Sequence, residues 1–193
     1  MKCKTVTIFE GPDGAGKTTA AKRFAESTDA IYVHFPALPN VYSGLPRMYT
    51  EGMLPALYGL KDVVFDRSWM SEAPYGTVFR EGQDRLSRSS INMLERLAMR
   101  CGAVVVLCKP PLEVCLDNYQ ARKELEMLDN ADQLMDVYDM YHQAKTSLPT
   151  TIYDYTQGLI IIPEVLNSIR HKPHLVGIRS AGNYKADVAL VGD

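Results

Sequence analysis

The sequence contains no CxxC pair, no long apolar run and no block of basic residues. The four cysteines, Cys3, Cys101, Cys108 and Cys115, lack the spacing of a disulfide framework or a metal site. We therefore expect reduced, mostly buried thiols and a cytoplasmic protein. No segment is long and apolar enough to span a bilayer, so no membrane partner is expected. A net charge of −2 gives no sign of non-specific nucleic-acid binding but leaves a specific DNA contact open.

Short β-rich runs alternate with longer helical patterns along the 193 residues. The predicted strands are residues 5–9, 31–35, 63–65, 103–108 and 151–153. The predicted helices are residues 17–26, 87–100, 111–126, 131–147 and 164–170, and residues 186–193 read as one more strand. Continuous apolar runs of this kind are typical of strands buried on both faces of a parallel sheet. The pattern predicts an α/β fold, with a five-stranded parallel sheet between two helical layers.

The segment from residue 9 to residue 19 reads FEGPDGAGKTT and contains the phosphate-binding pattern G-x-x-x-x-G-K-[ST]. A predicted strand precedes it and a predicted helix follows it, as the pattern requires. Backbone amides and the helix N-terminus would hold phosphates. Lys17 would reach the β- and γ-phosphates, and Thr18 would ligate Mg²⁺, so ATP and Mg²⁺ are the expected cofactors. The expected nucleotide-binding residues are Gly11, Pro12, Asp13, Gly14, Ala15, Gly16, Lys17, Thr18 and Thr19.

A phosphate loop alone does not name the reaction. GTPases carry an N-K-x-D-type base-reading motif, which this sequence lacks, and motors need a larger core. A small kinase therefore fits the chain best. An ATPase module without a small acceptor, serving a nucleic-acid complex, stays open as a different class of function.

FEGPDGAGKTT closely resembles the first motif of thymidylate kinases, and the likeness continues at residues 63–76, VVFDRSWMSEAPYG. It covers roughly residues 5–157 and implies a P-loop nucleoside-kinase fold, with a kinase domain at residues 1–172 and a tail or edge strand at residues 173–193. The resemblance places Asp66 near Mg²⁺ and the acceptor, and gives Arg67 the acceptor phosphate or backbone. Members of this superfamily often dimerise, so a homodimer is a further expectation.

Phosphoryl transfer also needs a cation beside the migrating group. The positions between Asp13 and Lys17 are Gly, Ala and Gly, so the loop itself supplies none. In thymidylate kinases with such a loop, a lid segment provides an arginine. By this likeness Arg122 is the candidate here, with Lys123 second.

The sequence departs from thymidylate kinases after the second predicted strand. Their Arg-Glu-Pro-Gly-Gly string is replaced by VHFPALPNVYSG at residues 33–44, although Arg47 could replace the lost acceptor contact. Residues 148–156 and 180–193 are instead similar to segments of phage-encoded kinases of the same superfamily. Those kinases phosphorylate 5-hydroxymethyl-deoxyuridine within DNA, an early step in thymidine hypermodification. This branch would place the protein in a host cytoplasm, and the tail also resembles the start of a uracil-glycosylase-type domain.

The acceptor decides which residues do the chemistry. A phosphate acceptor needs charge clamping, whereas a hydroxyl acceptor benefits from a carboxylate base. Glu10 is the candidate base, although thymidylate kinases carry a glutamate there as well. Asp13 would hold the free 3′-hydroxyl of a mononucleotide, and inside DNA it would need another role.

A base in DNA would also need a stacking platform and cations along the backbone. Trp69 and Tyr75 are the candidate platform, followed by Arg80, Arg85 and Arg88. The sequence favours transfer to the hydroxymethyl group of 5-hydroxymethyl-deoxyuridine in DNA. The alternative is a dTMP or dNMP kinase that makes the diphosphate.

Overall fold

The computed structural model describes residues 2–35, 44–121, 130–143, 145–158 and 166. The predicted tail strand and the boundary at residue 172 lie outside these residues. Of the predicted helix at 164–170, only Leu166 is described, where it is helical and buried. No helix in the described ranges has the length and apolar character needed to cross a bilayer.

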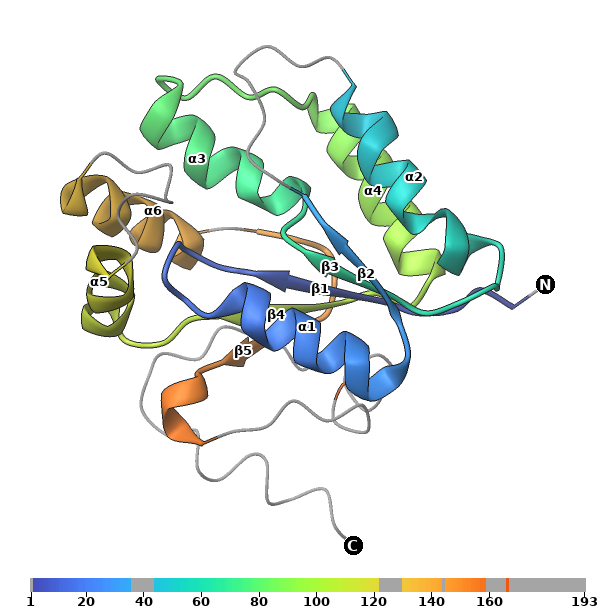
Figure 1. Ribbon diagram of the computed structural model, residues 1–193. Coiled ribbons are helices and arrows are strands. Elements are labelled where there is room, and N and C mark those ends of the chain that lie inside the picture. The colour runs from blue at the N-terminus through green and yellow to red at the C-terminus, as the bar shows by residue number, and fades with distance from the viewer. Residues whose placement is uncertain (1, 36–43, 122–129, 144, 159–165, 167–193) are drawn as a thin grey trace, which may run out of the picture.

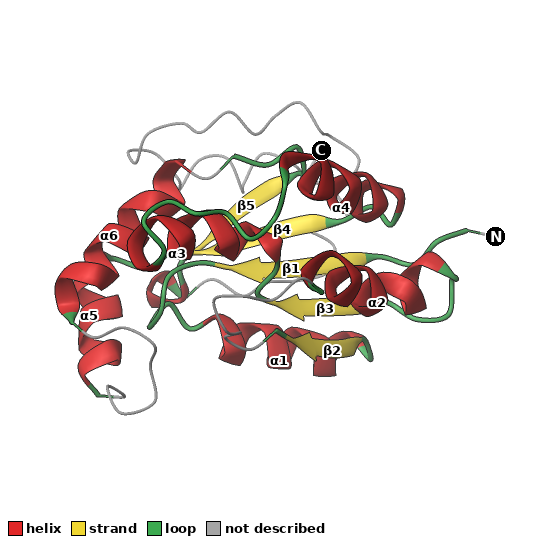
Figure 2. Cartoon of the chain, turned by 90° about the horizontal axis from the view of Figure 1, so that it is seen from above, coloured by secondary structure: helices red, strands yellow, loops and turns green. Residues whose placement is uncertain are grey.

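The described residues form one five-stranded parallel sheet with the strand order β2-β3-β1-β4-β5, which Figure 2 shows from above. The strands are β1 (Val6–Glu10), β2 (Ile31–His34), β3 (Val63–Asp66), β4 (Val104–Cys108) and β5 (Thr150–Tyr153). The helices are α1 (Lys17–Thr28), α2 (Leu45–Leu57), α3 (Glu72–Phe79), α4 (Arg88–Arg100), α5 (Leu112–Gln120) and α6 (Ala131–Gln143), with short turns η1 (Trp69–Ser71) and η3 (Tyr155–Gln157). The predicted α/β class and five-stranded sheet are confirmed.

The central strands are buried on both faces because helices cover both sides of the sheet (Figure 1). Side chains alternate along a strand. Val63 and Phe65 of β3 therefore join one core cluster with α2 and α4, while Val64 joins a second cluster with α1 and α6. This two-sided burial explains why the strands read as continuous apolar runs.

Helices α2 and α3 are absent from the sequence prediction. Helix α2 buries Leu45, Tyr49, Met53 and Ala56, which is a helical spacing, but two prolines and a glycine interrupt the pattern. Gly52 lets α2 pack closely on the sheet, because a Cβ there would lie 3.0 Å from the rings of Phe35 and Phe65. Helix α3 is short and contains a proline and a glycine, so its propensity signal is weak.

The sheet register gathers polar side chains at one edge. Asp66 ends β3 and pairs in register with Phe9 of β1 and with His34 of β2. Glu10 is the last residue of β1, beside the turn that leads into α1. Ligands of open α/β sheets bind outside the carboxyl ends of the strands, so this edge is where a site is expected.

Candidate active site

The phosphate loop lies between the end of β1 and the start of α1, packed against β4 and α5. Gly11 and Gly14 have φ angles of 141° and 72°, which only glycine adopts readily. A Cβ on Gly11 would run into the carbonyl of Cys108, and one on Gly14 would run into the carbonyl of Cys115. These two positions must be glycine because the loop backbone is in close contact with its neighbours.

The Lys17 side chain is buried within the loop. Its Nζ donates a 2.5 Å hydrogen bond to the carbonyl of Pro12 and lies 4.0 Å from Oδ1 of Asp13. Burial and the nearby Arg67 charge lower the pKa of Lys17. The ammonium group therefore lies where phosphates at the N-terminus of α1 would meet it.

Asp66 is fully buried but has one uncommitted oxygen. Its Oδ2 accepts a 2.6 Å hydrogen bond from the Tyr32 hydroxyl and lies 3.0 Å from Nδ1 of His34. Its Oδ1 is buried and has no hydrogen-bond partner among the described residues. Burial alone would raise the pKa of Asp66, but the Tyr32 and Thr18 hydroxyls and the Lys17 charge bring it below the usual value. The side chain is therefore a charged carboxylate.

The free Oδ1 and the neighbouring Thr18 hydroxyl fit a magnesium ion. Mg²⁺ prefers oxygen ligands and usually keeps several waters, binding through one or two carboxylates and the phosphates of a substrate. Within the described ranges, no three His, Cys, Asp or Glu side chains come together as a metal cage. One carboxylate and one hydroxyl therefore suit a nucleotide-dependent magnesium site better than a resident metal centre.

Arg67, Asp13 and Tyr75 form a second cluster beside the loop. One guanidinium nitrogen of Arg67 pairs with Asp13, and the other donates a 3.0 Å hydrogen bond to the Tyr75 hydroxyl. The guanidinium also lies 5.0 Å from the centre of the Tyr75 ring. Burial alone would raise the pKa of Asp13, but the charges of Arg67 and Lys17 hold it below its usual value.

Arg67 itself is held in an unusual backbone conformation. Its φ is 72°, which is uncommon for a residue other than glycine, and its amide donates to the carbonyl of Phe9 at 2.9 Å. Such strain is found mainly at functional sites. The Arg67 side chain keeps 22 % of its surface exposed, so it can meet a ligand from the edge of the site.

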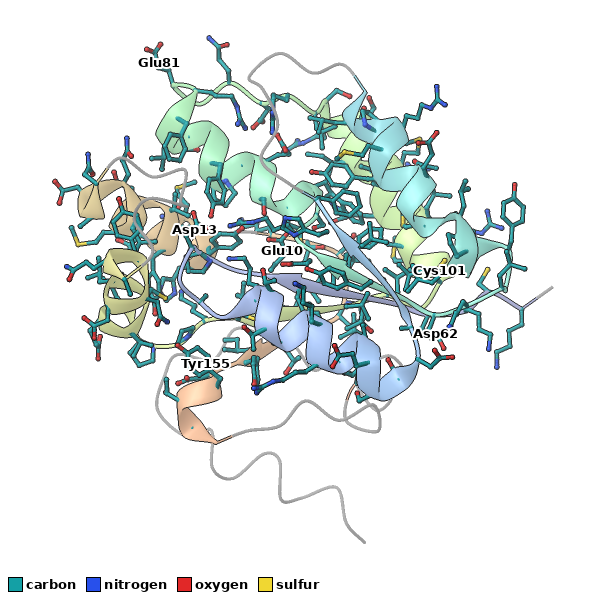
Figure 3. The ribbon with its side chains drawn as sticks, in the orientation of Figure 1. Glu10, Asp13, Asp62, Glu81, Cys101 and Tyr155 are labelled. Carbon is teal, nitrogen blue, oxygen red and sulfur yellow. The ribbon has the colours of Figure 1, made fainter. Side chains whose placement is uncertain are left out.

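Glu10 is completely buried, and both of its carboxylate oxygens accept hydrogen bonds. Oε1 accepts from Ser68 at 2.7 Å, while Oε2 accepts from Ser71 and from Tyr141, each at 2.9 Å. In Figure 3, Glu10 and Asp13 lie toward one end of the sheet, whereas Asp62 and Cys101 lie toward the other. Glu10 thus joins β1 to η1 and α6, and its role as a base stays a prediction.

The expected stacking platform is not on the surface. Trp69 is only 2 % exposed and packs edge-on against Tyr49 in the core, because η1 turns its ring inward. Tyr75 is also buried, beneath Arg67. Neither ring is exposed to a base in this conformation, and their role as a stacking platform stays a prediction.

The arginines expected to follow a DNA backbone are placed differently from one another. Arg80 and Arg85 both bind the buried Glu72, and Arg85 does so through two 2.8 Å hydrogen bonds. Arg88 is exposed at the start of α4. Two of the three therefore serve an internal ion pair.

The remaining expected acceptor residue lies away from these contacts. Arg47 is exposed on α2 and pairs with Glu51 at 2.6 Å. Arg122 and Lys123 lie outside the described residues. The structure brings together Lys17, Thr18, Asp66, Arg67 and Asp13, and their roles remain predictions.

Sequence reasoning missed several partners at this edge. His34 ends β2 as Asp66 ends β3, so the strand-end rule that found Asp66 would have found it. Tyr32, Ser68 and Tyr141 carry no motif, and only the fold shows their contacts with Asp66 and Glu10.

Comparisons with known proteins show the fold. No family model matches the chain, and no curated protein matches it. The YorR protein of Bacillus subtilis, solved with phosphorylated GDP, has a TM-score of 0.62 and 18% identity, over 79% of this chain and 87% of that chain. Deoxyadenosine kinase from M. mycoides, solved with dCMP and dCDP and also with dCTP, has a TM-score of 0.51 and 15% identity, over 87% of this chain and 97% of that chain. The chain therefore has the P-loop nucleoside-kinase fold.

Proposed function

We propose that the protein is an ATP- and Mg²⁺-dependent kinase that transfers the γ-phosphoryl group to a thymidine-like deoxynucleotide. The observation that carries this proposal is the buried, charged Asp66, whose unpartnered Oδ1 lies near Thr18 and the phosphate loop. A charged oxygen without a partner is costly to bury unless a ligand satisfies it. Nucleotides bound to two solved structures of the same fold support a nucleotide ligand.

Each residue of the site then has a physical role. Lys17 would bind the β- and γ-phosphates, and Thr18 and Asp66 would hold Mg²⁺, which neutralises phosphate charge when it is bound. Arg67 would clamp the acceptor, with Asp13 and Tyr75 holding its guanidinium in place. Arg122 remains the predicted cation beside the transferred group.

The acceptor that we favour is the hydroxymethyl group of 5-hydroxymethyl-deoxyuridine in DNA. Asp13 is buried and its Oδ1 is paired with Arg67, which makes it a poor contact for the free 3′-hydroxyl of a mononucleotide. The likeness of residues 148–156 to phage kinases that act on DNA supports the same acceptor.

A free dNMP, with dTMP the first choice, is the second candidate. Among the described site residues, Glu10 already accepts three hydrogen bonds and Asp13 is ion-paired, so neither carboxylate stands ready as a base. A phosphate acceptor needs no base, and the exposed part of Arg67 suits its charge.

A labelled-transfer assay separates the candidates. The protein is incubated with γ-labelled ATP and Mg²⁺, together with dTMP, with single-stranded DNA containing hydroxymethyluracil, or with the same DNA containing thymine as a matched control. We expect label in the hydroxymethyluracil DNA and none in the thymine DNA. Label in dTMP alone would overturn the DNA acceptor, and ATP hydrolysis with no labelled acceptor would favour an ATPase module.

A further inference from the structure

The side chain of Asn118, on α5, joins the phosphate loop to the segment that follows β5. Its Nδ2 donates a 2.8 Å hydrogen bond to the carbonyl oxygen of Gly14 and another of 2.8 Å to the hydroxyl oxygen of Tyr155. A carbonyl oxygen can only accept, so the atom facing Gly14 must be the amide nitrogen. Both of its hydrogens are therefore used, and the orientation of the Asn118 amide is determined.

The bond to Gly14 orients a peptide group of the loop. The carbonyl of Gly14 and the N–H of Ala15 belong to one planar trans peptide, so they point in opposite directions. A donor that holds the carbonyl from outside turns the Ala15 N–H toward Pro12, whose carbonyl it reaches at 3.3 Å. Lys17 donates to that same carbonyl, so the Ala15 N–H and the ammonium group converge on one point. Both donors are satisfied by the Pro12 carbonyl in this structure, and a bound phosphate would take its place as their acceptor.

Tyr155 holds the Asn118 amide from the other side. Its ring lies against Gly16, where a Cβ would be only 3.0 Å from Cε1. The residue is 36% exposed, and Figure 3 shows it beside the lower end of the sheet, near the start of α1. Asn118 and Tyr155 thus link α5, the phosphate loop and η3.

We propose that Asn118 is a positioning residue of the donor site, which acts through the Gly14–Ala15 peptide to hold the phosphate loop in its triphosphate-binding conformation, while Tyr155 fixes the Asn118 amide. The inference rests on the proposed function only in requiring that the loop bind a nucleoside triphosphate. It does not depend on the acceptor. Since the contact acts on the phosphate-binding backbone, it affects ATP and inorganic tripolyphosphate alike.

Calorimetric titration of MgATP and of magnesium tripolyphosphate tests this inference in the full chain. We expect Asn118→Ala to weaken both ligands by the same factor, about tenfold, which is typical of one lost hydrogen bond. Tyr155→Phe keeps the ring and loses only the hydroxyl, so we expect the affinity for each ligand to fall about threefold. The double variant should bind both ligands no more than about tenfold more weakly than the wild type, because the two groups act in one chain of contacts. Gln120→Ala, an exposed position on the same helix, is the matched control and should match the wild type.

Steady-state turnover and thermal melting without ligand separate positioning from a general structural role. In Asn118→Ala, the KM for ATP should rise by the factor seen in the titration while kcat changes less than twofold. Unchanged affinity for both ligands would overturn the inference, even if the melting temperature fell. Weaker ATP binding with normal tripolyphosphate binding would also overturn it, because it would show a contact to base or sugar.

Failure of the proposed function can be told apart from failure of this inference. A wild-type protein that binds MgATP but labels no acceptor refutes the proposed transfer, and the Asn118 comparison is still decided by the titration. A wild-type protein that binds neither ATP nor tripolyphosphate refutes both.

Discussion

At the scale of single residues, the buried and unpaired Oδ1 of Asp66 is what supports the proposed nucleotide site over a glycine-rich turn. A glycine turn needs no buried carboxylate with an unpaired oxygen, whereas a magnesium–triphosphate site does. The lowered pKa of Asp66 keeps the group charged throughout the neutral range.

We expect Asp66→Asn to weaken the Mg²⁺ dependence of turnover strongly. The amide keeps the shape of the side chain but removes the charge that would hold the metal, so the Mg²⁺ concentration at half-maximal rate should rise at least about tenfold. Titration of MgCl₂ at fixed ATP measures this change.

Asp62→Asn is the matched control, because Asp62 precedes β3 at the opposite end of the strand and bonds Thr5. An equal Mg²⁺ requirement in the wild type and in Asp66→Asn would contradict the assignment of Asp66 to the metal.

Glu10 gives the second prediction at this scale. Three hydroxyl groups donate to its two buried oxygens, and a glutamine offers only one acceptor oxygen to them. We expect Glu10→Gln to lower the free energy of unfolding by about 1–3 kcal/mol and to change kcat by less than about tenfold. Urea unfolding and turnover are the two measurements. A large loss of kcat at unchanged stability would instead make Glu10 the catalytic base.

At the scale of helices and strands, the fold could be predicted where a segment has one clear physical signal. Strand β4 is an unbroken apolar run because both of its faces are covered, and α1 follows an unmistakable loop motif. Helix α2 was missed because Pro46, Gly52 and Pro55 interrupt its helical spacing.

The candidate site shows the same division between what the sequence could predict and what it could not. The loop residues and Asp66–Arg67 are contiguous motifs, so they could be predicted. The contacts of Asp66 with Tyr32 and of Glu10 with Tyr141 join residues far apart in the chain. The burial of Trp69 could not be predicted, because closeness in sequence to Arg67 does not reveal which way a turn points its ring.

Lys109, which follows β4, tests the packing between β4 and α6. Its Nζ is buried without a hydrogen-bond partner among the described residues, 4.7 Å from the centre of the Tyr138 ring. Burial lowers its pKa from the ordinary 10.5 to about 8, although Asp139 opposes this. The folded protein thus loses this proton at a lower pH than the unfolded chain, so the cost of burying the charge is greatest below pH 8 and falls as pH rises toward 10.5.

We expect Lys109→Met to raise the free energy of unfolding at pH 7 by about 1 kcal/mol, a modest value because solvent screens the half-buried charge. The advantage over the wild type should shrink as pH rises above 8. Titration of the buried cysteines lowers the free energy of unfolding as pH rises, because burial raises the pKa of Cys115 to about 11. This effect opposes that of Lys109. The measurement is therefore the difference in the free energy of unfolding between the two proteins, from urea unfolding across pH 7–10. A difference that stays constant with pH would contradict the titration of Lys109.

At the scale of the whole molecule, the parallel sheet brings the phosphate loop, Asp66 and Arg67 to one edge although they come from separate segments. The described helices lie on the two faces of the sheet (Figures 1 and 2). The central claim is that this edge moves a phosphoryl group from ATP to a deoxynucleotide.

The most direct measurement of that claim is a single-turnover reaction with ATP labelled at either the γ- or the α-phosphate, run with hydroxymethyluracil DNA and dTMP together. We expect acceptor label from γ-labelled ATP only, and none with Lys17→Met, which lacks the ammonium group that would bind the phosphates. Acceptor label from α-labelled ATP, or consumption of ATP with no labelled deoxynucleotide, would contradict the claim that this edge transfers the γ-phosphoryl group.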